Sequence, residues 1–161
     1  MAIAVARCAG EPAPEHVVAS DVSADALRVA ARNVARHGLE DRIELRQGDL
    51  YAPLGPERGR IDLLLSNPPY VAESWRSRLQ PEVAREPARA LFAGPDGLAV
   101  IRRLLAEAPA VLAPGGHLLV EIGYDQAQAA SRLARAAGLV NVRVHPDLAG
   151  RARVLEGRRG D

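Results

Sequence analysis

Short apolar stretches rich in β-branched residues alternate along the chain with segments of helical periodicity, and this alternation restricts its fold more than any other feature. Strands are predicted at four of these stretches, His16–Ser20, Ile43–Arg46, Ile61–Leu65 and Leu118–Ile122. After the first of them, Ser23 is suited to cap a helix that runs to about His37. Strands that alternate with helices form a mostly parallel sheet. The sequence therefore predicts an α/β domain, and its 161 residues are enough for one domain with a core of its own.

The remaining segments are predicted as three helices, a long loop and two last strands. Met1–Cys8 reads as a helix that ends at Gly10, and Val71–Gly97 reads as a long loop with short helical pieces. Another helix places on one face the apolar residues Leu98, Ile101, Leu104, Leu105 and Leu112, and Pro114-Gly115-Gly116 closes it. A helix over Asp125–Ala137 precedes an antiparallel pair of strands, Val142–Val144 and Arg153–Leu155.

Composition excludes several classes of function. The formal net charge is +1, and the 21 basic residues are all arginines that are scattered along the chain, which argues against a polycation dedicated to nucleic acid. Cys8 is the only cysteine and the four histidines lack the spacing of zinc ligands, so we expect neither a disulfide framework nor a metal site. No apolar run approaches the roughly 18 residues of a membrane span, and Met1–Ala6 lacks the features of a signal peptide. A cytoplasmic protein is the expectation.

Polar residues follow several of the predicted strands. Asp21, Asp49, Asn67 and the segment after Ile122 each lie where a strand ends. Ligands of doubly wound sheets bind beyond the carboxyl ends of the strands, so these residues are expected to share one crevice. Asp21 could accept hydrogen bonds from the two hydroxyls of a ribose. The alternative is a carboxylate that only interacts with the dipole of the helix that starts after Ser23.

Asp49 lies in the segment Gln47-Gly48-Asp49-Leu50. Its carboxylate could accept from the exocyclic amine of a base while Leu50 supplies an apolar wall. The alternative is a turn aspartate that bonds its own backbone.

The most informative segment is Ser66-Asn67-Pro68-Pro69-Tyr70, directly after a buried strand. The prolines have no N–H to pair into a sheet, so carbonyl oxygens remain as free acceptors. A planar NH₂ group could donate to the Asn67 side-chain oxygen and the Pro68 carbonyl while the Tyr70 ring covers its flat face. Such acceptors would hold a weakly nucleophilic nitrogen in line for attack on an activated methyl group. The alternative is a proline-rich exit that merely caps a sheet.

With Asp21 and Gly48-Asp49 upstream, the Asn67-Pro68-Pro69-Tyr70 motif resembles the class I S-adenosylmethionine-dependent methyltransferases that methylate planar nitrogens. Further segments are similar to the HemK-type peptide chain release factor glutamine methyltransferases, and the likeness covers nearly the whole chain. These segments are Arg85-Glu86-Pro87, Ala90-Leu91, Gly94–Leu98, Leu112–Gly116, Leu119–Gly123 and Asp147–Val154.

The resemblance implies a Rossmann-like class I methyltransferase sheet with helices on both faces, in which residues 1–161 form a partial catalytic domain. It implies methyl transfer from S-adenosylmethionine to the side-chain amide of the glutamine in the Gly-Gly-Gln loop of release factors, with no membrane and no direct nucleic-acid partner. Asp21 would hold the ribose, and Asp49 and Leu50 would border the adenine. Asn67, Pro68, Pro69 and Tyr70 would grip the glutamine, with Asn67 also against the cofactor. Glu86 lies in a retained segment but is assigned no chemical role, and an ion pair with a nearby arginine that stabilises the loop is the alternative. Glu121 is interpreted as structural, with contact to the site as the alternative.

The sequence departs from the family's pattern at its start. The family places an acidic-Gly-x-Gly-x-Gly turn between its first strand and first helix, and this chain lacks that first strand and glycine-rich turn, since Ala2–Ala6 matches the helix that follows them. The family's amino-terminal helical domain is missing as well. The missing strand would lie between the strands at His16 and Ile61, so we expect two unpaired sheet edges, weak cofactor binding and a need for a partner strand. Two other hypotheses stay open, an N6-adenine or guanine methyltransferase of nucleic acid and an inactive remnant or interaction module.

Overall fold

The computed structural model describes residues 1–8 and 14–161, which form two compact units, Met1–Gly55 and Pro56–Asp161. Each unit is described by itself. The helix end predicted at Gly10 lies outside the described residues.

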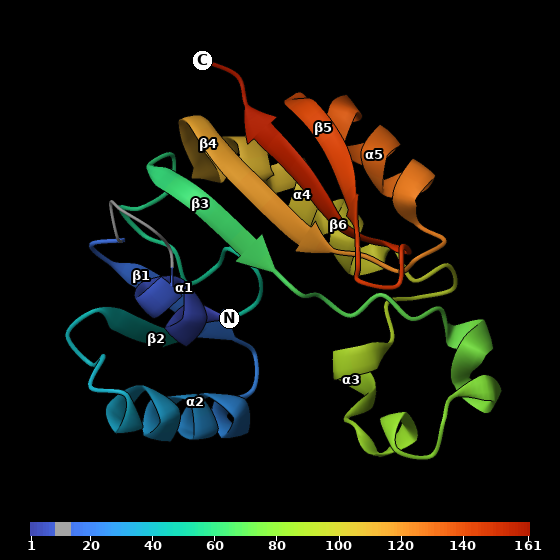
Figure 1. Ribbon diagram of the computed structural model, residues 1–161, viewed down its shortest axis with the longest axis horizontal. Helices are drawn as coiled ribbons and strands as arrows, with labels where there is room; N and C mark the ends of the chain where they lie inside the picture. The colour runs from blue at the N-terminus through green and yellow to red at the C-terminus, as the bar shows by residue number, and fades with distance from the viewer. Residues whose placement is uncertain (9–13) are drawn as a thin grey trace. The chain divides into compact units, whose positions relative to one another are not determined.

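Over its described residues, the first unit contains two strands and two helices, which Figure 1 labels. In chain order they are α1 (Ala2–Cys8), β1 (Val17–Asp21), α2 (Ala24–Arg36) and β2 (Ile43–Gln47). The strands are parallel, with Val17 opposite Ile43 and Asp21 opposite Gln47, so both end at the same edge of this small sheet. Ala6 of α1 and Val34 of α2 join Leu39 and Ile43 in one buried apolar cluster.

Local chemistry sets the ends of α2 as the sequence predicts. Ser23 is extended and its hydroxyl oxygen accepts from the Ala26 N–H at 3.3 Å, which satisfies one of the unpaired donors of the first turn. Gly38 follows the helix with φ +63°, a conformation that favours glycine.

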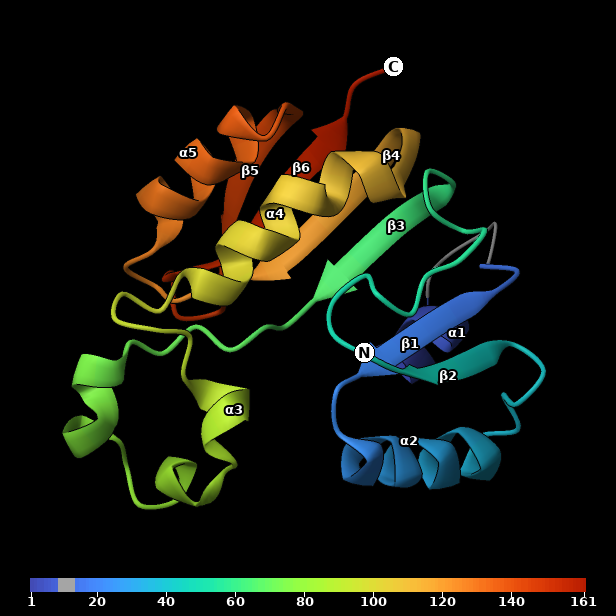
Figure 2. The same ribbon diagram turned by 180° about the vertical axis from the view of Figure 1, so that it is seen from behind.

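The second unit contains four strands, three α-helices and two short 3₁₀ helices. They are β3 (Ile61–Ser66), η1 (Glu73–Arg78), η2 (Val83–Arg85), α3 (Ala88–Leu91), α4 (Ala99–Val111), β4 (Leu112–Glu121), α5 (Ala127–Ala136), β5 (Leu139–Pro146) and β6 (Ala152–Arg159). The sheet has the order β3-β4-β6-β5, in which β3 and β4 are parallel and the other neighbours are antiparallel. Helices α4 and α5 lie on one face of this sheet (Figure 2).

The core of this unit lies between that face and the two helices. Its fully buried side chains come from both layers and include Ile101, Leu104, Leu118, Val120 and Leu155. Burial of apolar surface contributes about 25 cal/mol per Å², so this layer stabilises the unit. The predicted antiparallel pair of last strands is confirmed, and both strands are longer than predicted.

One prediction about α4 is wrong. Leu112 does not continue the apolar face of the helix but begins β4, where it pairs with Ile61. The register then shifts, so that Leu63 pairs with His117, and Pro114-Gly115-Gly116 lies inside the strand as an irregular stretch. Pro114 has no N–H for a ladder, Gly115 has φ +75°, and a Cβ on Gly116 would lie 2.6 Å from the Ile61 carbonyl oxygen. The segment therefore bends the strand instead of separating it from the helix.

Strands β1 and β3 belong to different sheets, and each is an edge strand among the described residues, as expected. Over residues 1–8 and 14–161, no helix is both long and apolar enough to cross a membrane.

Candidate functional site

Asp21 is the last residue of β1 and its side chain is exposed. One carboxylate oxygen, Oδ1, accepts from the Ser23 N–H at 2.7 Å, which is the local role given above as the alternative. The other oxygen, Oδ2, accepts no hydrogen bond from the part of the chain that the structure describes. The carboxylate is thus oriented by its own turn and keeps one oxygen for a ligand.

Asp49 is exposed just beyond β2, at the same sheet edge as Asp21. The Gly48 N–H donates to the Asp21 carbonyl at 3.1 Å, so the two strand ends are joined directly. Leu50, half-buried beside Asp49, has φ +47°, which is uncommon for a residue with a side chain and marks local strain. A Cβ on Gly48 would lie 2.4 Å from the Pro53 Cγ, so packing inside this unit already requires a glycine there.

Asn67, Pro68 and Pro69 leave β3 in the second unit, where the predicted strand exit is confirmed. The Asn67 side chain is exposed and has no hydrogen-bonding partner among the described residues. In the described part of the chain, no backbone N–H donates to the carbonyls of these three residues, as expected from the prolines. Pro68 is buried, so the motif is packed against the unit while its amide stays accessible.

Tyr70 is held at both its side chain and its backbone. Its hydroxyl donates to Glu121 Oε1 at 3.0 Å, and its carbonyl accepts from Gln126 Nε2 at 2.9 Å. Burial, followed by the hydrogen bond to the Glu121 carboxylate, raises the pKa of Tyr70 above its ordinary value, and Arg153 opposes this rise. The phenol therefore stays protonated at neutral pH and its ring is fixed at the end of β4. Through this hydrogen bond Glu121 contacts the Asn67–Tyr70 motif, as in the alternative interpretation given for Glu121 above.

The long loop after Tyr70 returns to its own starting point. Val71 and Phe92 form an isolated parallel bridge, in which the Val71 N–H donates to Leu91 at 2.9 Å and the Ala93 N–H donates to Val71 at 3.0 Å. The Glu73 N–H donates to the Gly94 carbonyl at 3.0 Å. These hydrogen bonds pair residues 71–73 with residues 91–94, and we call this paired stretch the neck. The helical pieces η1, η2 and α3 lie between its two sides (Figure 1).

Sequence reasoning did not single out Gln126 or Gly97. Gln126 follows the strand end after Ile122, and this position at a carboxyl end was the available signal for it. Glu86, for which an ion pair was considered, is exposed at the end of η2 and forms none with the described residues.

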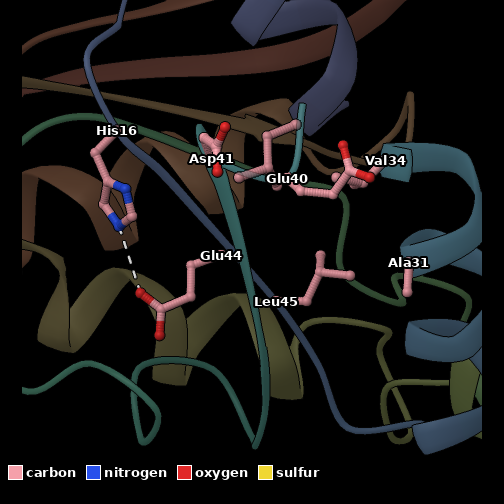
Figure 3. Close-up of a pocket in the computed structure, with 8 residues that line it drawn as sticks. His16, Ala31, Val34, Glu40, Asp41, Glu44 and Leu45 are labelled. Atoms are coloured by element: carbon pink, nitrogen blue, oxygen red, sulfur yellow. Dashed lines mark ion pairs between the residues drawn. The ribbon is translucent and has the colours of Figure 1, made fainter. Parts of the chain in front are cut away.

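A separate cavity of about 490 Å³ lies in the first unit (Figure 3). It is lined by His16, Glu40, Asp41 and Glu44 over an apolar floor, and His16 Nε2 lies 3.5 Å from Glu44 Oε2. It is at the amino end of β2, whereas Asp49 follows the carboxyl end. None of the predicted site residues lines it.

Residues 2–96 match the methyltransferase small domain family. A release factor glutamine methyltransferase of Cereibacter sphaeroides is 49% identical over 157 residues, which are 97% of this chain and 55% of that protein. A ribosomal protein uL3 glutamine methyltransferase of Bradyrhizobium diazoefficiens is 51% identical over 107 residues, which are 66% of this chain and 33% of that protein. The chain spans 55% to 56% of the length of release factor methyltransferases that it matches almost throughout.

Among solved structures, a methyltransferase from Pyrococcus furiosus is similar with a TM-score of 0.61 at 20% identity, covering 91% of this chain and 64% of that chain. At this identity the likeness concerns the fold alone, and it confirms the predicted α/β fold of class I methyltransferases. The similarity to release factor glutamine methyltransferases that the motifs indicated is confirmed by the named relatives. Because the family matches more than half of the residues, the chain belongs to the methyltransferase small domain family.

Proposed function

We propose that this chain carries the catalytic part of a methyltransferase that transfers a methyl group from S-adenosylmethionine to the side-chain amide nitrogen of the glutamine in the Gly-Gly-Gln loop of peptide chain release factors. The observation that carries the proposal is the Asn67–Tyr70 exit of β3. It presents an exposed amide with no partner among the described residues, next to proline carbonyls that accept no described backbone N–H. The named relatives support the substrate class, and cytoplasmic release factors would place the protein in the cytoplasm.

The residues of the first unit suit the cofactor. Asp21 and Asp49 are exposed at one edge of a parallel sheet, and carboxylates there can accept from ribose hydroxyls and from an exocyclic amine. Leu50, half-buried beside Asp49, would supply the apolar border of the base. When bound, S-adenosylmethionine supplies a methyl group on a positively charged sulfur, which leaves as a neutral thioether while the amide nitrogen takes the methyl group and releases one proton to water.

The second unit would act on the glutamine. The Asn67 side-chain oxygen and the Pro68 carbonyl would each accept one of the two N–H bonds of the substrate amide, which fixes its plane. Positive charge develops on the nitrogen during attack, and these two oxygen dipoles would stabilise it. The Tyr70 ring, fixed by Glu121, would cover the face of the amide. Rate enhancement would come from orientation and electrostatics, with no side chain acting as a titrating base.

The test is a methylation assay with radiolabelled S-adenosylmethionine and a purified release factor. Asn67→Ala is expected to lower kcat at least about 100-fold, since one lost acceptor misorients a weak nucleophile. Asn33→Ala is the matched control, because Asn33 is exposed on α2 and lies outside the proposed machinery. A release factor whose Gly-Gly-Gln glutamine is changed to alanine should accept no label.

Other substrates give distinct outcomes. Labelling of ribosomal protein uL3 in place of the release factor would assign the activity named for the Bradyrhizobium relative. Preference for an oligonucleotide would favour the nucleic-acid alternative. Equal rates for wild type and Asn67→Ala on the release factor would remove the proposed role of this residue.

A further inference from the structure

Among the described residues, Gln126 is the polar residue that is buried, with 7% of its surface exposed. The mechanism proposed above does not use it. Its amide makes three hydrogen bonds. Oε1 accepts from the Gly123 N–H at 2.9 Å, and Nε2 donates to the Tyr70 carbonyl at 2.9 Å and to the Gly97 carbonyl at 3.3 Å. Both amide protons are therefore used, and a single side chain joins three separate segments of backbone.

Two of these segments approach Gln126 closely, and the one at Gly97 requires a glycine. Gly97 has φ +72°, and a Cβ there would lie 2.3 Å from the Tyr70 carbonyl oxygen and 2.8 Å from Gln126 Nε2. A Cβ on Gly123 would lie 3.0 Å from Gln126 Oε1. The close packing of backbone around this amide is typical of a site that fixes main-chain position.

We propose that Gln126 is a positioning residue for methyl transfer, which orients the substrate-binding acceptors of Asn67 and Pro68 by fixing the backbone at Tyr70. The inference rests on the proposed function and extends it. Tyr70 is the last residue of the motif, and the next residue, Val71, is the first residue of the neck. Movement of the Tyr70 carbonyl would therefore change the orientation of the peptide groups of Asn67 and Pro68. Because the two prolines form no sheet ladder, the anchor at Tyr70 supplies the restraint that a strand would otherwise provide.

The chemistry of the site calls for a neutral amide. Glutamine donates to two carbonyl oxygens and accepts from one N–H, which is the full complement of this site. Gln126→Glu keeps the shape but has no donor, so its carboxylate would face two carbonyl oxygens. Gln126→Met keeps much of the volume and loses all three hydrogen bonds without adding charge.

The first experiment measures kcat and both KM values for release factor methylation by the full chain. Gln126→Glu and Gln126→Met are expected to lower kcat about 10- to 100-fold, as misplaced reacting groups do, while KM for S-adenosylmethionine changes by less than about threefold. Gln128→Glu is the control, because Gln128 is exposed in the first turn of α5 and carries the same added charge two residues on. The kcat and both KM values of Gln128→Glu should equal those of the wild type.

The second experiment is hydrogen exchange followed by mass spectrometry on the same variants, without substrate or cofactor. The amides of Val71, Glu73 and Ala93 close the neck, and their exchange is expected to accelerate in the two Gln126 variants and to stay unchanged in Gln128→Glu. Gly97→Ala should accelerate it too. Gly150→Ala is its control, because Gly150 also has a positive φ, +77°, while it lies between β5 and β6 and a Cβ there would meet no atom within 4 Å.

The outcomes separate the two proposals. A wild-type kcat, or unchanged hydrogen exchange in the neck, in both Gln126 variants would overturn the positioning role. An equally large loss of kcat in Gln128→Glu would overturn it as well. If the wild type labels no release factor, the proposed function fails, and exchange alone then decides whether Gln126 fixes the motif. Faster neck exchange with intact far-UV circular dichroism would support that part, and unchanged exchange would remove it.

Discussion

Removal of one oxygen atom, in Tyr70→Phe, tests how firmly the proposed substrate-binding motif is tied to its sheet. The Tyr70 hydroxyl donates to Glu121 Oε1 at 3.0 Å between the exit of β3 and the last residue of β4. Phenylalanine keeps the ring and removes this bond together with the weaker interaction of the hydroxyl with Arg153. Glu121→Ala removes the acceptor, and the double variant completes a thermodynamic cycle.

The expected coupling energy follows from the geometry. A hydrogen bond to a charged acceptor contributes roughly 1.5–3 kcal/mol when buried. Both Tyr70 and Glu121 are half-buried, so water competes for each group. We expect a coupling of about 1 kcal/mol and a similar loss in Tyr70→Phe alone. Tyr124→Phe, at a tyrosine that is 52% exposed, should stay within about 0.5 kcal/mol of wild type.

The assay is urea unfolding followed both by far-UV circular dichroism and by the fluorescence of Trp75, the single tryptophan, which lies in the second unit. Coincident transitions justify a two-state analysis of that unit. If the two single losses add to within about 0.3 kcal/mol in the double variant, the two side chains do not interact and the reasoning is refuted.

The direction of the Tyr70 pKa supplies a second check. Because burial and then the bond to Glu121 raise this pKa in the folded state, the folded unit favours the protonated phenol. The stabilisation is fully present below the unfolded pKa of 10.0 and is lost as the pH rises through the folded value. The stability difference between wild type and Tyr70→Phe should therefore shrink above pH 10.0 and not below it.

Three further predictions follow from the site and the sheet edges. Gly48→Ala should destabilise the first unit by about 1–3 kcal/mol in thermal unfolding, because its Cβ would clash with Pro53, and Pro53→Ala should restore most of the loss. The hydrogen bond from His145 lowers the pKa of Glu156 below its ordinary 4.5, so Glu156→Gln should be less stable than wild type above pH 4.5 and equal to it once the pH falls through the folded value. In calorimetric titration with S-adenosylmethionine we expect Asp21→Asn to lower the affinity about tenfold, because the amide replaces one of the two carboxylate oxygens that would accept from the ribose hydroxyls; equal affinity in the variant and the wild type would contradict this.

Local patterns in the sequence were sufficient for most elements of the fold. Ser23 caps α2 and Gly38 ends it because capping depends on residues within one turn. The exit of β3 at Asn67 follows from proline's missing N–H, which acts in any context. The periodicity of apolar residues predicted the alternation of strands and helices and the two last strands.

Contacts between distant segments were decided by the tertiary structure. The spacing of Leu112 fits the apolar face of α4, but Leu112 begins β4 and pairs with Ile61. Pairing with a neighbouring strand outweighs the helical spacing of this one residue. Tyr70 and Gln126 are 56 residues apart, and no local rule brings their atoms within 2.9 Å. The sequence by itself determined where the proposed substrate-binding motif leaves the sheet, since that depends on neighbouring residues. Only the packed structure decided what holds the motif in place, because a buried amide can satisfy three backbone groups only after folding has brought them together.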